Sequence, residues 1–208
     1  MLLPVVLAAR FQESALLCRA DGPIRGPADL AGRRIGVRAY SQTTGMWLRG
    51  TLADRFALRP EAMRWTTFED AHVPEYRDPP WAERVPPGSD MLAMLRDGRL
   101  DAAIFGNDTP AGDDLRAVFP DPAAAGEAFR AAHGFTPVNH LLVAQRALLE
   151  EAPELAPKLV RLFPATAADR AALGPALALA VRYCVEQGLL PRPLAAEEIW
   201  AGLPATVA

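Results

Sequence analysis

The hydrophobic positions along the chain fall into two alternating patterns. Short apolar runs of strand length occupy about residues 2–8, 13–20, 34–38, 63–68, 100–106 and 138–144. Apolar residues recur at helical spacing over about residues 43–56, 90–98, 123–133, 153–163, 174–187 and 195–202. This alternation predicts an α/β fold with a mainly parallel sheet flanked by helices.

The stretch "RRIGVRAYSQTTGMWLRG", residues 33–50, passes from a predicted strand through a polar turn into a predicted helix. The hydroxyl groups of Ser41, Thr43 and Thr44 can accept hydrogen bonds from the amides of a first helical turn. Such a turn also presents free N–H groups and the positive end of the helix dipole, which favour a carboxylate or a phosphate. The turn therefore has two interpretations, an anion site or a helix N-cap with no further role.

A second polar turn, "GNDTP" at residues 106–110, follows the predicted strand at 100–106. The carboxyl ends of parallel strands share one edge of a sheet, and ligands collect at that edge. We therefore expect the turns at 39–44 and 106–110 to form two walls of one site. Residues 69–89 are rich in proline and charge and predict a long loop, a length typical of functional or disordered segments.

Composition narrows the classes of function. The chain has 208 residues, half of them apolar, which is enough for one large domain or two small lobes. Its formal net charge is −3 at pH 7, so no basic surface for nucleic acid is indicated. Cys18 and Cys184 lie far apart in apolar sequence and indicate neither a disulfide framework nor a metal site. The apolar segment 1–10 is too short to span a membrane and lacks signal-peptide features, which favours the cytoplasm.

Four segments, taken in order, resemble the 4,5-dihydroxyphthalate decarboxylase family of the type II periplasmic-binding-protein fold. They are "GPADLAGRRIGVRAYSQTTGMWLRGTLADRF", "SDMLAMLRDGRLDAAIFG", "VFPDPAAAGEAFRAAHGFTPVNHLLVAQRALLEEAP" and "YCVEQGLLPRPLAAEEIWA". The resemblance implies one periplasmic-binding-protein-like unit over 1–208. Residues 12–140 would form its second lobe, and 1–11 and 141–208 would supply crossover strands and C-terminal helices of the first. Members of the family have further strands and helices before the segment that here begins at Met1, so we expect an incomplete first lobe.

The same resemblance implies decarboxylation of a hydroxylated aromatic acid in the degradation of aromatic compounds. The site would hold the ring and its carboxylates and deliver a proton to a ring carbon. No prosthetic group is needed, because ring hydroxyls can feed electron density to that carbon; a divalent metal is left open, although the sequence has no ligand spacing for one. The residues expected to bind the substrate are Arg38, Tyr40, Ser41, Gln42, Thr43, Thr44, Trp47, Arg49, Gly106 and Asn107.

Two residues are expected to act chemically. His140, beside the apolar run at 138–144, is the candidate proton donor because imidazole titrates near neutral pH. Asp108 is the candidate acceptor of a phenolic proton. Both have ordinary structural interpretations, His140 as a hydrogen-bonded residue at a strand edge and Asp108 as a turn residue. His133 is expected to end a helix, and His72 lies in the long loop without a motif.

Two other functions remain open on the sequence. The first is a solute-binding or sensor protein that binds a small anion without chemistry. The second is the effector domain of a transcription regulator, which would need a helix-turn-helix that the chain does not contain. In each case the expected partner is a small aromatic or carboxylate ligand, with no nucleic acid or membrane bound by this chain. A homodimer is expected if missing cleft walls are supplied by a second copy.

Overall fold

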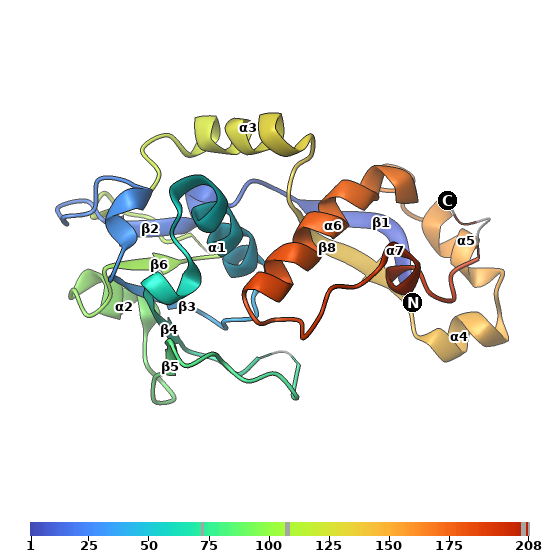
Figure 1. Ribbon diagram of the computed structural model, residues 1–208, viewed down its shortest axis with the longest axis horizontal. Coiled ribbons are helices and arrows are strands. Elements are labelled where there is room, and N and C mark those ends of the chain that lie inside the picture. The colour runs from blue at the N-terminus through green and yellow to red at the C-terminus, as the bar shows by residue number, and fades with distance from the viewer. Residues whose placement is uncertain (72, 107–108, 205–206, 208) are drawn as a thin grey trace.

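The computed structural model describes residues 1–71, 73–106, 109–204 and 207. Its larger part holds a six-stranded sheet, and its smaller part holds a two-stranded sheet with most of the C-terminal helices (Figure 1). Four of the six strands are parallel neighbours, and helices flank them. The predicted fold class, α/β with a mainly parallel sheet flanked by helices, is confirmed.

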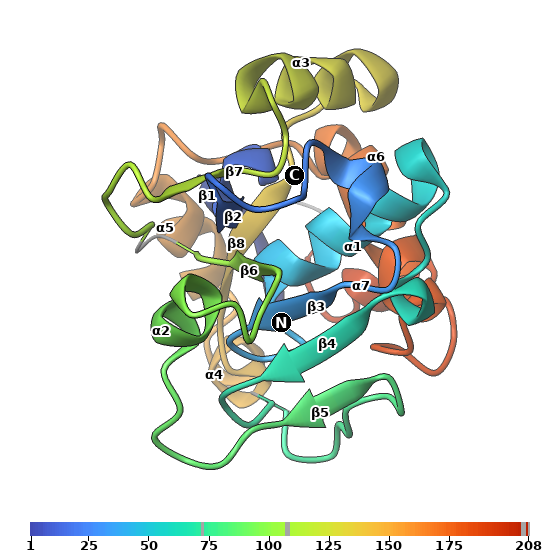
Figure 2. The ribbon, with the colours of Figure 1, turned by 90° about the vertical axis from the view of Figure 1, so that its left-hand side faces the viewer.

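The larger sheet has the strand order β5-β4-β3-β6-β2-β7. Its strands are β2 (Leu16–Arg19), β3 (Arg34–Val37), β4 (Arg64–Thr67), β5 (Ala82–Arg84), β6 (Ala102–Ile104) and β7 (Leu115–Ala117). Strands β5, β4, β3 and β6 run parallel, whereas β2 is antiparallel to both of its neighbours. Because β3, β4 and β6 point the same way, their carboxyl ends meet at one edge of the sheet (Figure 2).

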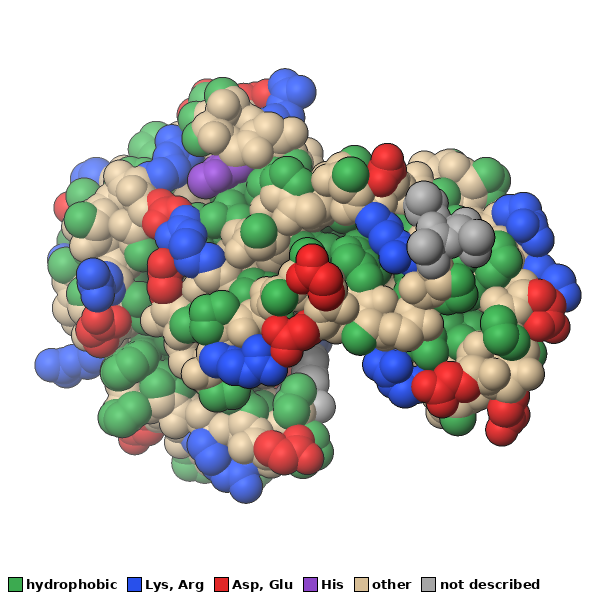
Figure 3. All heavy atoms as spheres, turned by 45° about the vertical axis from the view of Figure 1, so that its right-hand side comes forward, with side chains coloured by type: hydrophobic (Ala, Val, Ile, Leu, Met, Phe, Trp, Pro, Cys, Tyr) green, Lys and Arg blue, Asp and Glu red, His purple; other side chains and the backbone are tan. Residues whose placement is uncertain are grey.

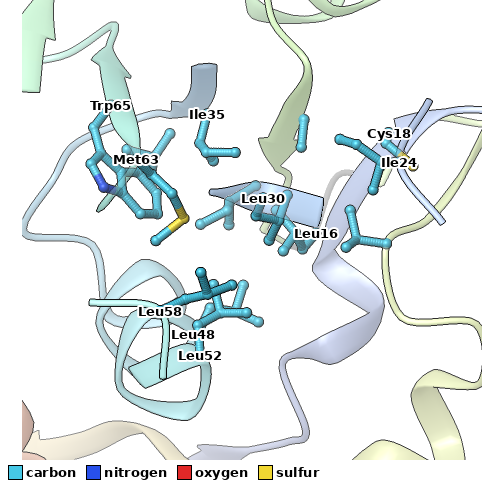
Figure 4. Packing of buried hydrophobic residues seen from close by; sticks show 14 of the residues in the cluster. Leu16, Cys18, Ile24, Leu30, Ile35, Leu48, Leu52, Leu58, Met63 and Trp65 are labelled. Carbon is cyan, nitrogen blue, oxygen red and sulfur yellow. The ribbon is translucent and has the colours of Figure 1, made fainter. Parts of the chain in front are cut away.

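Helices α1 (Thr43–Phe56), α2 (Met91–Arg96) and α3 (Pro122–His133) belong to the larger part. Apolar side chains of α1, among them Leu48 and Leu52, pack against buried side chains of the sheet such as Ile35 and Trp65 (Figure 4). Asp90 caps α2, and its carboxylate accepts hydrogen bonds from the amides of Leu92 and Ala93. The core thus fixes α1 against the sheet with its N-terminus near the end of β3.

The smaller part contains β1 (Leu2–Ala9), antiparallel to β8 (Val138–Val143). Its helices are α4 (Arg146–Glu151), α5 (Leu155–Arg161), α6 (Arg170–Glu186) and α7 (Ala196–Ile199). The chain passes to the larger part after β1 and returns in β8. Beside these crossings the side-chain amide of Gln12 donates to Asn139 Oδ1 at 2.7 Å, and the amide of Asn139 donates back at 3.4 Å. Among the described residues, no helix is both long enough and apolar enough to cross a membrane.

Helix α6 extends from the smaller part to α1 of the larger part (Figure 1). Gly50 of α1 lies against the ring of Tyr183, so a Cβ atom at position 50 would come within 2.1 Å of that ring. The Tyr183 hydroxyl donates to Asp54 at 2.7 Å. The two parts are therefore joined by close helix packing as well as by the two crossings.

Several short elements differ from the predictions. The strand predicted at 13–20 begins only at Leu16, because Glu13–Ala15 form a turn of 3₁₀ helix. The predicted loop at 69–89 contains β5, and neither β7 nor α4 was predicted. Three-residue strands and a six-residue helix carry too few positions for a periodic pattern to emerge.

Candidate functional site

A cavity of about 740 Å³ opens at the carboxyl edge of the larger sheet. Its walls come from both parts of the molecule, between which the surface dips in Figure 3. The described residues that line it are Ala8, Arg10, Arg38, Ser41, Gln42, Thr43, Thr44, Phe68, Glu69, Ser89, Asp90, Met91, Ile104, Phe105, Gly106, Asn139 and His140. The structure therefore brings the turn before α1 and the residue after Phe105 together in one cavity.

The turn before α1 leaves polar groups without partners. Gln42 is the N-cap residue, but its side chain makes no capping hydrogen bond. Ser41 Oγ and Gln42 Oε1 are both buried and have no hydrogen-bond partner in the described structure. The first-turn amides of a helix have no carbonyl partner within the helix, so they also remain available to a ligand. Side-chain capping, one of the two interpretations of this turn, is not what the structure shows.

Arg10 supplies a cation that the sequence did not point to. It lies just after β1, half-buried, and its guanidinium donates to Thr44 Oγ1 at 3.3 Å and to the Gly106 carbonyl at 3.4 Å. Both contacts are long for charge-assisted hydrogen bonds. Both acceptors are neutral, so the positive charge of Arg10 beside the start of α1 is not balanced by a carboxylate in the described structure.

Arg38 lines the same cavity but is already paired. Its Nε lies 3.2 Å from Glu69 Oε2, and the two side chains are 48% and 53% exposed. Arg38 follows β3 and Glu69 lies beyond the end of β4, so the pair sits across neighbouring strand ends. The electrostatic consequence is that Arg10, unlike Arg38, forms no ion pair with a carboxylate among the described residues.

The cavity also has an apolar lining. Phe68 and Phe105 come from the ends of β4 and β6, and Ile104 and Met91 lie beside them. Aromatic side chains of this kind offer a surface on which a planar ring can stack. The cavity thus combines a cationic end with a wall suited to an aromatic ligand.

The smaller part contributes Asn139 and His140 from β8. His140 is exposed and lines the cavity, on the strand that pairs with β1 at Ala8. His133 ends α3, as predicted, and packs on the ring of Phe129. Burial lowers the pKa of His133, with the charge of Asp54 opposing that shift.

Tyr40, Trp47 and Arg49 do not line the cavity, contrary to expectation. The Tyr40 side chain is fully buried, and its hydroxyl accepts a hydrogen bond from Trp81 Nε1 at 3.0 Å. Trp47 is 1% exposed and donates from its indole to the Val138 carbonyl at 2.9 Å. The physical reason is packing: α3 and α6 supply Phe129 and Tyr183, which cover Trp47.

Arg49 is fully buried in the core, with no carboxylate partner among the described residues. Its Nε donates to Gln187 Oε1 at 2.7 Å, and Nη2 donates to the Tyr40 carbonyl at 2.6 Å. The guanidinium also lies 3.9 Å from the centre of the Tyr40 ring. Burial lowers the pKa of Arg49 and raises that of Tyr40. Arg49 therefore holds the turn that forms the cavity wall without reaching the cavity.

Three of the residues singled out in the sequence, His72, Asn107 and Asp108, lie outside the described residues. The described part of the chain has no group of three or more His, Cys, Asp or Glu side chains placed to hold a metal ion. Sequence reasoning missed Arg10, Phe68, Phe105 and Asn139. The two phenylalanines could have been found, since each lies at the carboxyl end of a predicted strand.

Comparison with known proteins gives two sequence relatives and a set of structural neighbours. A 4,5-dihydroxyphthalate decarboxylase from Comamonas testosteroni is 27% identical over 219 aligned residues, covering 95% of this chain and 64% of the relative. A protein of the same name from Pseudomonas putida is 30% identical over 108 residues, covering 49% of this chain and 42% of the relative. The chain thus spans less than two thirds of the length of each. No family model matches the chain.

Among solved structures, the periplasmic aliphatic sulphonate binding protein SsuA from Escherichia coli is similar with a TM-score of 0.49. It is 16% identical, and the match covers all of this chain and 63% of SsuA. The sequence relatives confirm the resemblance to 4,5-dihydroxyphthalate decarboxylases that the motifs indicated.

Proposed function

Because the chain is a relative of the 4,5-dihydroxyphthalate decarboxylases, we propose that it decarboxylates a hydroxylated aromatic acid bound in the cavity at the carboxyl edge of the larger sheet. The chain matches only part of each relative's length, so the activity itself, and not only its substrate, is part of the proposal. Its support comes from the groups gathered around the cavity.

The single observation that carries the proposal is the cationic end of the cavity. Among the described residues, the Arg10 guanidinium contacts two neutral oxygens, one of them on Thr44 in the first turn of α1. The Ser41 hydroxyl, which has no hydrogen-bond partner in the described structure, lines the same cavity. A carboxylate placed there would accept charge-assisted hydrogen bonds from the guanidinium and would gain from the helix dipole. The site is therefore suited to hold one carboxylate firmly.

The rest of the cavity suits the ring of such an acid. A volume of about 740 Å³ lies within the usual range of small-molecule sites. Phe68 and Phe105 offer stacking surfaces at the ends of β4 and β6. With the carboxylate at Arg10, the ring lies within the same cavity as these two side chains.

The proposed reaction replaces a carboxylate on the ring by a proton. A ring carbon accepts the proton while a ring hydroxyl supplies electron density. The bond between that carbon and the carboxylate then breaks, and its electron pair restores the aromatic ring as carbon dioxide leaves. We assign the proton delivery to His140, which lines the cavity and carries an imidazole, the side chain that most often acts as a general acid or base. Asp108 keeps its proposed role as acceptor of a phenolic proton.

The reaction as written needs no redox partner and no prosthetic group. The cytoplasm as its compartment and a homodimer as its assembly stay predictions from the sequence. A divalent metal also stays open, to be tested by comparing turnover with and without a chelator.

The test measures carbon dioxide release and ligand binding on the purified full chain, with 4,5-dihydroxyphthalate and a panel of related acids. Arg10→Met is expected to weaken binding by about 10- to 100-fold, the range for loss of a charge-assisted hydrogen bond. Arg64→Met is the matched control, because Arg64 is exposed at the opposite end of β4. Binding without product would support a non-catalytic solute-binding protein instead. If no aromatic acid binds, the proposal fails.

A further inference from the structure

Gln42 differs from the buried glutamines Gln12 and Gln187. Gln12 donates to the Arg10 carbonyl and to Asn139, and Gln187 accepts from Arg49 and donates to the Met46 carbonyl. Their side-chain amides are thus engaged in the fold. Gln42 Oε1, in contrast, is buried without any hydrogen-bond partner in the described structure.

The backbone of Gln42 is already committed to the fold. Its amide donates to the Ala39 carbonyl at 3.0 Å, and its carbonyl accepts from the Met46 amide at 2.9 Å. As the N-cap residue of α1 it makes no side-chain cap, although a serine, an asparagine or an aspartate would be preferred for that task. The side-chain oxygen is therefore not explained by helix capping or by packing of the turn.

The position of the side chain places its amide group at the cavity wall. Gln42 lines the cavity together with Gly106, and its amide nitrogen would lie 3.3 Å from a Cβ atom at position 106. The absence of a side chain at Gly106 leaves room for the amide. An unpartnered buried acceptor is unfavourable, and a ligand that brings a donor would remove that cost.

We propose that Gln42 recognises a ring hydroxyl of the ligand, its side-chain amide turning so that the oxygen reaches the cavity and accepts a hydrogen bond from that hydroxyl. This inference rests on the proposed function, but it concerns a contact different from the carboxylate contact at Arg10. An amide oxygen accepts from a protonated hydroxyl and has nothing to accept from a methyl ether or a bare ring. Gln42 is thus a specificity-determining residue that selects hydroxylated acids over analogues without a donor.

The test is calorimetric titration of the full chain with 3,4-dihydroxybenzoate, 3,4-dimethoxybenzoate and benzoate. The wild-type chain is expected to bind the dihydroxy acid about tenfold more tightly than the dimethoxy acid, which is the effect of one hydrogen bond. Gln42→Met is expected to abolish this preference by weakening only the dihydroxy acid. Gln145→Met is the matched control, because Gln145 is also an N-cap glutamine without a side-chain cap, but it is exposed at α4 away from the cavity.

The outcomes separate this inference from the function on which it rests. A hydroxyl preference that persists in Gln42→Met would overturn the role of Gln42. Equal weakening of all three ligands would also overturn it, because Gln42 would then shape the turn rather than recognise a hydroxyl. Binding that depends on Arg10 but shows no hydroxyl preference would leave the proposed carboxylate site standing and refute only this inference. If none of the three acids binds the wild-type chain, this inference fails, and the titration with 4,5-dihydroxyphthalate decides whether the proposed function fails with it.

Discussion

The guanidinium of Arg49 donates a 2.6 Å hydrogen bond to the backbone carbonyl of Tyr40, two residues before Gln42, the N-cap residue of α1. The helix that carries Arg49 thereby holds the turn that precedes it. Since Gln187 of the C-terminal region accepts from the same guanidinium, the position of the cavity wall depends on a buried charge with neutral partners. Arg49 is a positioning residue for the cavity.

Replacement of Arg49 by methionine is expected to destabilise the protein. The change leaves the Tyr40 carbonyl and Gln187 Oε1 buried without their donor, and we expect the free energy of unfolding to fall by about 1–3 kcal/mol. Urea denaturation measures it, with Arg64→Met as an exposed control. A direct ligand contact would show the opposite pattern, a loss of affinity with unchanged stability.

Gly50 is expected to be indispensable for the packing of α1 on α6. An alanine there would place its Cβ 2.1 Å from the Tyr183 ring, so the helices must separate or the ring must move. Overpacking of this kind typically costs about 1–3 kcal/mol. Gly26→Ala is the control, because position 26 is extended and has no atom within 4 Å of the added Cβ. Equal thermal stability of the two variants would contradict the close contact.

Glu69→Gln is expected to raise affinity for aromatic acids with two carboxylates more than for those with one. The substitution frees Arg38 from its ion pair and removes a negative charge from the cavity wall. Because both side chains are about half exposed, we expect only about a two- to fivefold gain, which weakens as salt is added. Titrations at two ionic strengths measure this, with exposed Glu83→Gln of β5 as the control. An equal gain in affinity for acids with one and with two carboxylates would contradict this prediction.

His140→Asn is expected to slow decarboxylation by about 100-fold or more while leaving substrate affinity nearly unchanged, because general acid catalysis typically contributes 10²–10⁴-fold. His133→Asn is the control, since His133 ends α3 and does not line the cavity. Single-turnover rates and equilibrium binding are measured on the same preparations. Unchanged turnover in His140→Asn would remove this residue from the mechanism.

Glu13→Gln is expected to stabilise the protein at neutral pH. Glu13 is 2% exposed, and burial raises the pKa of its carboxyl, an effect that backbone hydrogen bonds partly oppose. A carboxyl with a raised folded-state pKa binds a proton more tightly in the native state. Its ionisation therefore reduces stability as pH rises from about 4.3, the unfolded pKa of Glu, through the folded pKa. A glutamine at position 13 removes this loss of stability, and its side-chain oxygen can still accept a hydrogen bond from the backbone amide of Gln12.

Denaturant unfolding of both chains from pH 4 to pH 8 tests the direction of this pH dependence. The advantage of the glutamine variant should be largest near neutral pH and should shrink as the solution is made acidic. An advantage that instead grew on acidification would mean that the ionised carboxylate stabilises the fold.

The elements predicted well are those with strong local signals. Helix α1 was predicted at about 43–56 and α2 after a capping Asp90, because polar starts and apolar spacing are encoded within a few residues. The joint placement of Ser41–Thr44 and Gly106 followed from topology, since parallel strands share a carboxyl edge. These parts of the site needed no long-range information.

The parts that were missed depend on contacts between distant segments. Arg10 reaches Thr44 and Gly106 only because β1 crosses beside the sheet, which no local pattern reveals. Trp47 and Arg49 lie on a helix that both α3 and α6 approach, so both side chains became core residues. A single amphipathic helix cannot indicate how many neighbours will cover it.

The bond between Arg49 and Gln187 joins residues 138 positions apart, and Gln187 also reaches back 141 positions to Met46. At synthesis rates of about 5–20 residues per second, roughly 7–28 s separate the synthesis of the two partners. During that interval the nascent polypeptide carries an arginine whose final acceptor has not yet been translated. The contact that holds this wall of the cavity therefore forms only after α6 has been synthesised, and a chain halted before α6 would lack it.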